Sequence, residues 1–374
     1  MVDINSSTVF EMDKYIKEKY NYNFIGYNED FYNNYFIERE SEGINTLFWL
    51  IDNDKKFLFK RVNAFDLNKW GDLIVMELAK EVGIDCAIYR PAVFNGETGF
   101  ITESFLKNNE KLINAKELMD LEIKNNFSDK ITNKIKKLCS QSNSRWRPDI
   151  YMSLNNYVDM IEIIDTNIFL SDLEKERIKI SLKKLLCFDL ITLQSDRHPE
   201  NYGIIKKDNG YEFSPLYDND ASFCLGSKNI LKKIEKYIYD VPRAKNYRED
   251  ILEMYHNFNS AFSYRDNDYL TGKYGENKIV INKKIRASVD DIISLGDYEV
   301  KFILIQMCNK LSVDNLNRII DDLENKYKCK MDDNLRYYIT NIYKNNLIYI
   351  KNKIKEMESN SLAFNSFSNK VFVK

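Results

Sequence analysis

The sequence predicts an α+β protein in which a small, strand-rich lobe is joined to a large, mostly helical lobe. Residues 31–106 contain short aromatic and aliphatic runs separated by turn-prone segments, which is typical of antiparallel strands. After residue 106 the pattern changes to helical periodicity in long segments rich in Lys, Glu and Asn. The prolines avoid the centres of these segments, as helices require. We therefore expect one main helix in the small lobe and a ligand-binding cleft between the lobes.

This change of pattern divides the chain into four predicted regions. A polar and aromatic appendage occupies residues 1–30, and the small lobe follows over residues 31–106. The large lobe covers residues 107–357, and only residues 191–225 interrupt its helical pattern. The last segment, 358–374, is rich in Ser and Asn, so we expect a loose tail there.

The composition is that of a globular protein. Of 374 residues, 44% are hydrophobic and 30% are charged, and no apolar run approaches the roughly 18 residues of a spanning helix. Lys and Arg (55) nearly balance Asp and Glu (57), so we expect no direct binding to nucleic acid or to a membrane surface. Six scattered cysteines, two histidines and no secretory signal predict a reducing, cytoplasmic location and no zinc site.

The small lobe is predicted to be a set of strands around one helix. The expected strands cover residues 31–39, 47–51, 57–62, 87–94 and 99–105. The helix is expected from residue 67 or 70 to residue 82, because apolar residues recur four apart and Gly83 suits its C-terminal end.

The large lobe is predicted to be helical on either side of a short hairpin. The longest helical patterns cover residues 157–169, 174–190, 300–311 and 335–357. The hairpin strands are expected near residues 202–205 and 211–214, within the interruption of the helical pattern.

The same interruption contains the residues with the clearest chemistry. It reads Asp196-Arg197-His198-Pro199-Glu200-Asn201, followed by the predicted hairpin and then by Asp218. Phosphoryl transfer from ATP needs a carboxylate that orients and deprotonates the attacking hydroxyl, and hard oxygen ligands for Mg²⁺. Asp196 suits the first role. Asn201 and Asp218 suit the second, because the returning hairpin would bring Asp218 back to the loop. Asp220 is an alternative to Asp218.

These segments resemble the catalytic and metal-binding motifs of the HipA-like serine/threonine kinases, Asp-x-His-x-x-Asn and Pro-x-Tyr-Asp, the second being Pro215-Leu216-Tyr217-Asp218 here. The Asp-Arg-His form of the first is also similar to the loop of phosphatidylinositol kinases. The resemblance implies a bilobal protein-kinase-like fold, with Asp196 as catalytic base and with Asn201 and Asp218 as Mg²⁺ ligands. It also implies that His198 lies near the phosphates, with a histidine packed in the loop as the alternative.

The resemblance extends to a nucleotide-binding lysine in the small lobe. Residues 56–61 resemble the family's apolar strand that ends in an ATP-binding lysine, and the alternation of that strand aims Lys60 into the cleft. Its ammonium would act as a point charge on the α- and β-phosphates. Asp72 and Glu77 on the next helix are both candidate partners of Lys60. They lie five positions apart and cannot both face it, so the choice stays open.

Two further segments complete the expected nucleotide site. Glu103-Ser104-Phe105 resembles the family's hinge, in which the Glu103 carbonyl and the Phe105 amide would bind adenine. The turn of residues 41–46 falls where a loop would cover the phosphates, and it contains a single glycine, Gly43. The additional N-terminal domain of longer HipA toxins is not evident, so an antitoxin partner is not expected.

The sequence as a whole therefore predicts an ATP- and Mg²⁺-dependent serine/threonine kinase. It would transfer the γ-phosphoryl group of ATP to a hydroxyl of a protein substrate, which the sequence does not identify. One alternative is a lipid or small-molecule kinase with the same site, which the Arg197 form of the loop favours. Another is a non-catalytic nucleotide-binding scaffold, which the presence of Lys60, Asp196, Asn201 and Asp218 disfavours.

Overall fold

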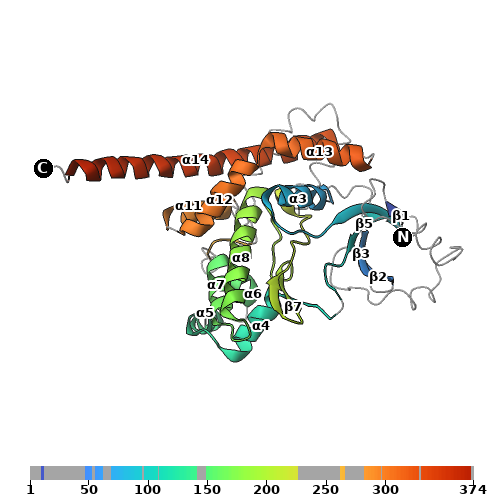
Figure 1. The fold of residues 1–374 in the computed structure, drawn as a ribbon, viewed down its shortest axis with the longest axis horizontal. Helices are drawn as coiled ribbons and strands as arrows, with labels where there is room; N and C mark the ends of the chain where they lie inside the picture. The colour runs from blue at the N-terminus through green and yellow to red at the C-terminus, as the bar shows by residue number, and fades with distance from the viewer. Residues whose placement is uncertain are drawn as a thin grey trace, which may run out of the picture.

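The computed structural model in Figure 1 describes part of the chain. The described residues are 10–11, 47–52, 55–61, 69–94, 97–107, 109–140, 149–225, 262–265, 282–295, 297–327 and 330–371. The strand expected at residues 31–39 and the turn that contains Gly43 lie outside this part, as does most of the predicted appendage.

The small lobe contains a sheet of strands in the order β1-β4-β5-β3-β2. The strands are β1 (Phe10–Glu11), β2 (Leu47–Asp52), β3 (Lys55–Arg61), β4 (Tyr89–Phe94) and β5 (Glu97–Glu103). All neighbours are antiparallel except β1 and β4. The four longer strands occur where the alternation of apolar residues predicts them.

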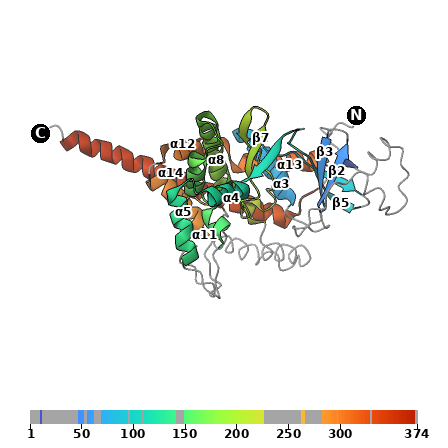
Figure 2. The same cartoon turned by 90° about the horizontal axis from the view of Figure 1, so that it is seen from below.

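Helix α3 (Lys69–Val82) is the expected helix of the small lobe. It ends at Gly83, whose φ of 73° is the left-handed conformation that glycine adopts without strain. The side chains of Ile74 and Leu78 are fully buried. Figures 1 and 2 both show α3 between the sheet and the helical part of the molecule, where it contacts strand β4 on one side and helix α13 (Val313–Tyr327) on the other.

The large lobe is mostly helical. Its remaining helices are α4 (Ala115–Asn125), α5 (Asp129–Ser140), α6 (Ile150–Leu154), α7 (Tyr157–Thr166), α8 (Asp172–Thr192), α11 (Asn282–Ser294), α12 (Tyr298–Lys310) and α14 (Asp333–Val371), with the short 3₁₀ helix η1 (Ser222–Cys224). Helix α8 begins at a capping box of Ser171 and Glu174, and its C-terminal half is buried. One continuous apolar core joins α3, α8, α12 and α14, so the helix of the small lobe packs into the core of the large one.

A second sheet, in the order β6-β7-β8, lies beside the start of α4. Strands β7 (Gly203–Lys207) and β8 (Gly210–Phe213) form the predicted hairpin, whereas β6 (Lys111–Asn114) falls where helical periodicity was expected. The close approach of β6 depends on Gly203, because a Cβ atom there would lie 2.3 Å from the carbonyl oxygen of Ile113.

Helix α14 continues through residues 358–371, for which the composition predicts a loose tail. Its far end points away from the rest of the chain in Figures 1 and 2. In the part of the chain that the structure describes, no helix has both the length and the apolar character needed to span a membrane. The α+β, two-lobe fold class predicted from the sequence is confirmed.

Candidate active site

The loop of residues 193–202 begins where α8 ends. Leu193 adopts a left-handed conformation with φ of 56°, and this turns the chain out of the helix. The side-chain oxygen of Gln194 then accepts a hydrogen bond from the Asp196 amide at 3.0 Å. The Asn201 side-chain amide donates to the Asp196 carbonyl oxygen at 2.9 Å and closes the loop. Asp196 and Asn201 are therefore held together by the loop itself.

Two oxygen-bearing groups of this loop remain available for a ligand. Among the described residues, nothing donates a hydrogen bond to Oδ1 of Asn201, and the Asp196 carboxylate makes neither a hydrogen bond nor an ion pair. Partial burial raises the pKa of Asp196, and the negative charges of Asp218 and Asp220 raise it further against the opposing effect of His198. Asp196 is thus a better proton acceptor than an ordinary aspartate.

His198 is held by contacts within the loop. Its Nδ1 accepts a hydrogen bond from the Glu200 amide at 3.3 Å and lies 3.8 Å from the Glu200 carboxylate. An accepting Nδ1 leaves the ring proton on Nε2. The contacts of the described residues therefore match the packed-loop interpretation of His198.

The segment that contains Asp218 is fixed by both lobes. Before it, Leu216 forms a parallel bridge with Cys86, and its backbone bonds to Asp85 and Ala87 are 2.8 Å long. Asp218 itself has φ of 53°. Its amide donates to the Tyr89 hydroxyl of β4 at 3.0 Å, and its carbonyl oxygen accepts from the Gln194 side chain at 3.3 Å.

Lys60 on β3 reaches this segment across the two lobes. Its ammonium forms ion pairs with Asp218 and, at 3.0 Å, with Asp220. Burial alone would lower the pKa of Lys60, but Asp218, Asp220 and then Asp72 outweigh it and leave the pKa well above the usual range. Lys60 therefore stays charged at any physiological pH. Asp218 and Asp220 are alternative metal ligands in the sequence analysis, and in the structure Lys60 contacts both.

The donor set around Lys60 suits a hard divalent cation. Two carboxylates lie at the Lys60 ammonium, and Oδ1 of Asn201 on the neighbouring loop is a neutral oxygen donor. No group of three His, Cys, Asp or Glu side chains is placed to hold a metal ion within the described ranges. A metal here would consequently depend on an amide oxygen, or on oxygens of the ligand, as well as on the carboxylates.

Of the two acids that the sequence left open on α3, Asp72 faces the site. It is 1% exposed, its Oδ1 accepts a hydrogen bond from the Asn219 amide at 2.7 Å, and its charge acts on Lys60. Glu77 instead pairs with Lys80 on the same helix at 2.7 Å. Gly71 makes this approach possible, because a Cβ atom there would lie 2.9 Å from the carbonyl oxygen of Asp220.

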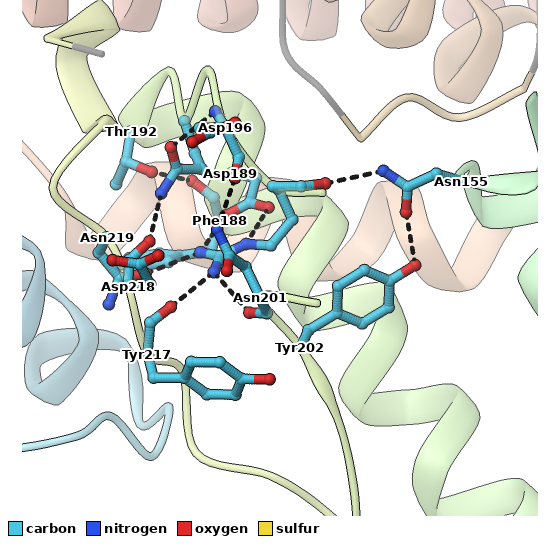
Figure 3. A network of polar contacts seen from close by, with 12 residues as sticks. Asn155, Phe188, Asp189, Thr192, Asp196, Asn201, Tyr202, Tyr217, Asp218 and Asn219 are labelled. Carbon is cyan, nitrogen blue, oxygen red and sulfur yellow. Dashed lines mark hydrogen bonds and ion pairs between the residues drawn. The ribbon is translucent and has the colours of Figure 1, made fainter. Parts of the chain in front are cut away.

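Arg197 is a functional candidate whose position the sequence did not predict. Its side chain is fully buried and pairs with Asp189 of α8 through two bonds of 3.0 and 3.1 Å. It also donates to the carbonyl oxygens of Asn201 and Tyr217 and to the side chain of Asn219. Figure 3 shows these partners gathered at one point. A lone arginine between polar residues reads as a surface residue, so the sequence carries little signal of this role.

The expected hinge lies next to the Asp218 segment. The Ser104 amide pairs with the Lys56 carbonyl at 2.7 Å, which extends the pairing of β5 with β3. The Phe105 ring packs on Tyr217, with the ring centroids 5.6 Å apart. The Phe105 amide donates to no carbonyl of the described chain, whereas the Glu103 carbonyl accepts a long bond of 3.4 Å from Thr102.

Solved structures of kinases are similar to this chain in fold. The chain is similar to the proinflammatory kinase CtkA of Helicobacter pylori, with a TM-score of 0.56 and 13% identity over 84% of this chain and 95% of that one. It is less similar to HipA of Shewanella oneidensis MR-1, solved with HipB and operator DNA (TM-score 0.47, 12% identity, 92% and 72% coverage). The choline kinase LicA of Streptococcus pneumoniae gives a TM-score of 0.23, with 15% identity and 84% and 99% coverage.

No protein-family model matches the sequence, and no curated protein matches it either. The similarity to CtkA shows that this chain has a kinase-like fold, so the resemblance noted in the sequence is confirmed at the level of the fold.

Proposed function

We propose that this chain is a kinase that uses ATP and Mg²⁺ to phosphorylate a serine or threonine hydroxyl of a protein substrate. The observation that carries the proposal is the ion pair of Lys60 with Asp218, beside the loop that holds Asp196 and Asn201, in a kinase-like fold. The chemistry of phosphoryl transfer needs these groups together, because most of its catalysis is positioning and charge stabilisation.

In this proposal each group of the site has one task. Lys60 binds the α- and β-phosphates as a permanent cation. Asn201 and Asp218 would hold Mg²⁺, and Asp220 would contribute a second carboxylate at the same place. When bound, Mg²⁺ neutralises charge on the phosphate oxygens. Backbone groups at Glu103 and Phe105 would bind adenine.

Asp196 would act as the base. The acceptor oxygen forms a bond to the γ-phosphorus, the bond from that phosphorus to the β–γ bridging oxygen breaks, and the hydroxyl proton passes to the Asp196 carboxylate. Phosphorylated acceptor and ADP are the products. The carboxylate of Asp196 has no partner among the described residues and has a raised pKa, and both properties suit this task.

The nature of the acceptor rests on the resemblance to HipA-like serine/threonine kinases. The Arg197 form of the loop favours lipid or small-molecule acceptors, but Arg197 is fully buried and bonds the loop to the Asp218 segment, so its side chain is not placed to read an acceptor. A cytoplasmic location fits the described cysteines, which form no disulfide.

The test is transfer of labelled γ-phosphate by the full chain to host lysate, a generic protein, inositol lipid and small alcohols, in parallel. The variant Asp196→Ala should lower transfer by about 10²- to 10⁴-fold while it leaves ATP binding intact. Asp208→Ala, in the exposed turn between β7 and β8, is the matched control. Transfer by Asp196→Ala at the wild-type rate would refute the role of Asp196, and label on lipid or alcohol alone would replace the protein acceptor.

A further inference from the structure

We infer that Arg197 is a positioning residue that locks the base-bearing loop and the metal-binding segment to one another and to helix α8. The inference rests on the proposed function for its catalytic meaning. Its structural content concerns two segments of the chain that are far apart in sequence. These are the loop of residues 196–201 and the segment of residues 217–219.

Every donor of the Arg197 side chain is used. Nε and Nη2 donate to the two carboxylate oxygens of Asp189 at 3.0 and 3.1 Å. Nη1 donates to the carbonyl oxygens of Asn201 at 3.0 Å and Tyr217 at 2.9 Å, and Nη2 also donates to Oδ1 of Asn219 at 2.7 Å. A guanidinium has five N–H donors in a rigid plane, so the side chain is fully satisfied.

Besides Asp189, Arg197 has three acceptors, and they lie at or beside the proposed metal ligands. One is the backbone carbonyl oxygen of Asn201, whose side-chain amide oxygen is a proposed metal ligand. The other two are Tyr217 and Asn219, the residues immediately before and after Asp218. One rigid group therefore fixes the distance between the two proposed ligands without touching either of their side-chain oxygens.

The reference point for this arrangement is the end of helix α8. Asp189 is fully buried there, one turn before the helix ends. The backbone of Arg197 is held separately, because its carbonyl oxygen accepts a bond of 2.8 Å from the Asn155 side chain, which in turn accepts one from the Tyr202 hydroxyl. Arg197 is thus anchored at both ends, and its freedom to rearrange is small.

Lysine cannot replace this arrangement. Its ammonium keeps the positive charge beside Asp189, but its three donors diverge from a single atom and cannot reach acceptors on both segments. Arg197→Lys therefore separates the positioning function from simple charge neutralisation. The double substitution Arg197→Met and Asp189→Leu removes both charges, so no buried charge is left uncompensated. The new apolar side chains fill a similar volume.

The experiment compares wild type, Arg197→Lys, the Arg197→Met/Asp189→Leu double variant and the control Arg177→Lys. Arg177 is an exposed arginine on α8, the helix that carries Asp189. Amide hydrogen exchange should become at least about tenfold faster in both 196–203 and 216–220 in the Arg197 variants, with exchange in α5 unchanged. Calorimetry should show unchanged binding of ATP in chelator, together with a roughly tenfold smaller gain in ATP affinity on adding Mg²⁺.

Unchanged exchange in the two segments would overturn the inference, whatever the activity of the chain. Faster exchange with an unchanged gain from Mg²⁺ would also overturn it, since the segments would then not need Arg197 to hold the metal. If the wild type shows no Mg²⁺-dependent ATP binding and no transfer, the proposed function fails. In that case the exchange result still decides whether Arg197 locks the two segments.

Discussion

At the scale of single residues, the site gathers the carboxylates of Asp196, Asp218 and Asp220 close to one another. Lys60 forms ion pairs with Asp218 and Asp220, and Asp196 lies close enough to both carboxylates for their charge to raise its pKa. Like charges held this close to one another oppose folding and are typical of functional sites. The effect on stability can be measured by replacing the Asp196 carboxylate with a neutral side chain.

The variant Asp196→Asn should raise Tm slightly at neutral pH. The pKa of Asp196 in the folded chain is raised above its unfolded value of about 3.9, so ionisation of this group opposes folding, and its contribution is favourable only at acidic pH. The difference in Tm should therefore disappear as the pH falls through the raised pKa, where the wild-type carboxyl is also neutral. Wild-type phosphate transfer should fall over the same interval, because the base must be ionised.

Differential scanning calorimetry across this pH range checks the stability effect, with Asp208→Asn in the exposed turn after β7 as the control. A lower Tm for Asp196→Asn at neutral pH would contradict the proposed environment of the carboxylate. So would a Tm difference that does not change with pH.

At the scale of elements, helix α3 helps to position the segment of residues 216–220, which holds a proposed metal ligand. Asp72 binds the Asn219 amide, and Gly71 lies against the backbone of Asp220. The periodicity predicts the helix but not which acid faces the site. That choice depends on a backbone amide 147 positions later in the chain, which no local pattern encodes.

Gly71→Ala tests this contact. In a free helix the change would stabilise by about 1 kcal/mol, but here the new Cβ atom would lie 2.9 Å from a backbone oxygen, so α3 or the segment must move. We expect a net loss of about 1–3 kcal/mol in the free energy of unfolding and weaker binding of ATP with Mg²⁺. Urea unfolding and calorimetry measure the two effects.

Gly83→Ala is the matched control for Gly71→Ala. A Cβ atom at Gly83 meets nothing within 4 Å, but its φ of 73° makes the change cost about 1 kcal/mol through backbone strain alone. It should leave the binding of ATP and Mg²⁺ unchanged. If Gly71→Ala stabilises the chain and binds ATP and Mg²⁺ with wild-type affinity, the contact between Gly71 and the Asp220 backbone does not constrain the site.

At the scale of the whole molecule, several contacts between the lobes meet at residues 216–220. Lys60, Asp72, Tyr89 and Phe105 of the small lobe all contact this short segment. The sequence predicts the two lobes, the strand that carries Lys60 and the hairpin that precedes Asp218, because alternation and helical periodicity are local. It does not predict strand β6 or the bonds of Arg197, since these depend on partners that only the folded chain brings together.

This convergence predicts that ligand binding at Asp218 stabilises both lobes at once. At about 100 times the Kd, ATP with Mg²⁺ should add about 2.7 kcal/mol and raise Tm by roughly 3 °C in a single transition, whereas ATP in chelator should give a smaller shift. Asp218→Asn should remove most of the extra shift due to Mg²⁺, and asparagine tolerates the left-handed backbone at this position. Thermal unfolding followed by fluorescence gives the shifts, and Asp208→Asn serves again as the control. Equal shifts with and without Mg²⁺ in the wild type would remove Asp218 from the metal site, and two separate transitions would show that the segment does not couple the lobes.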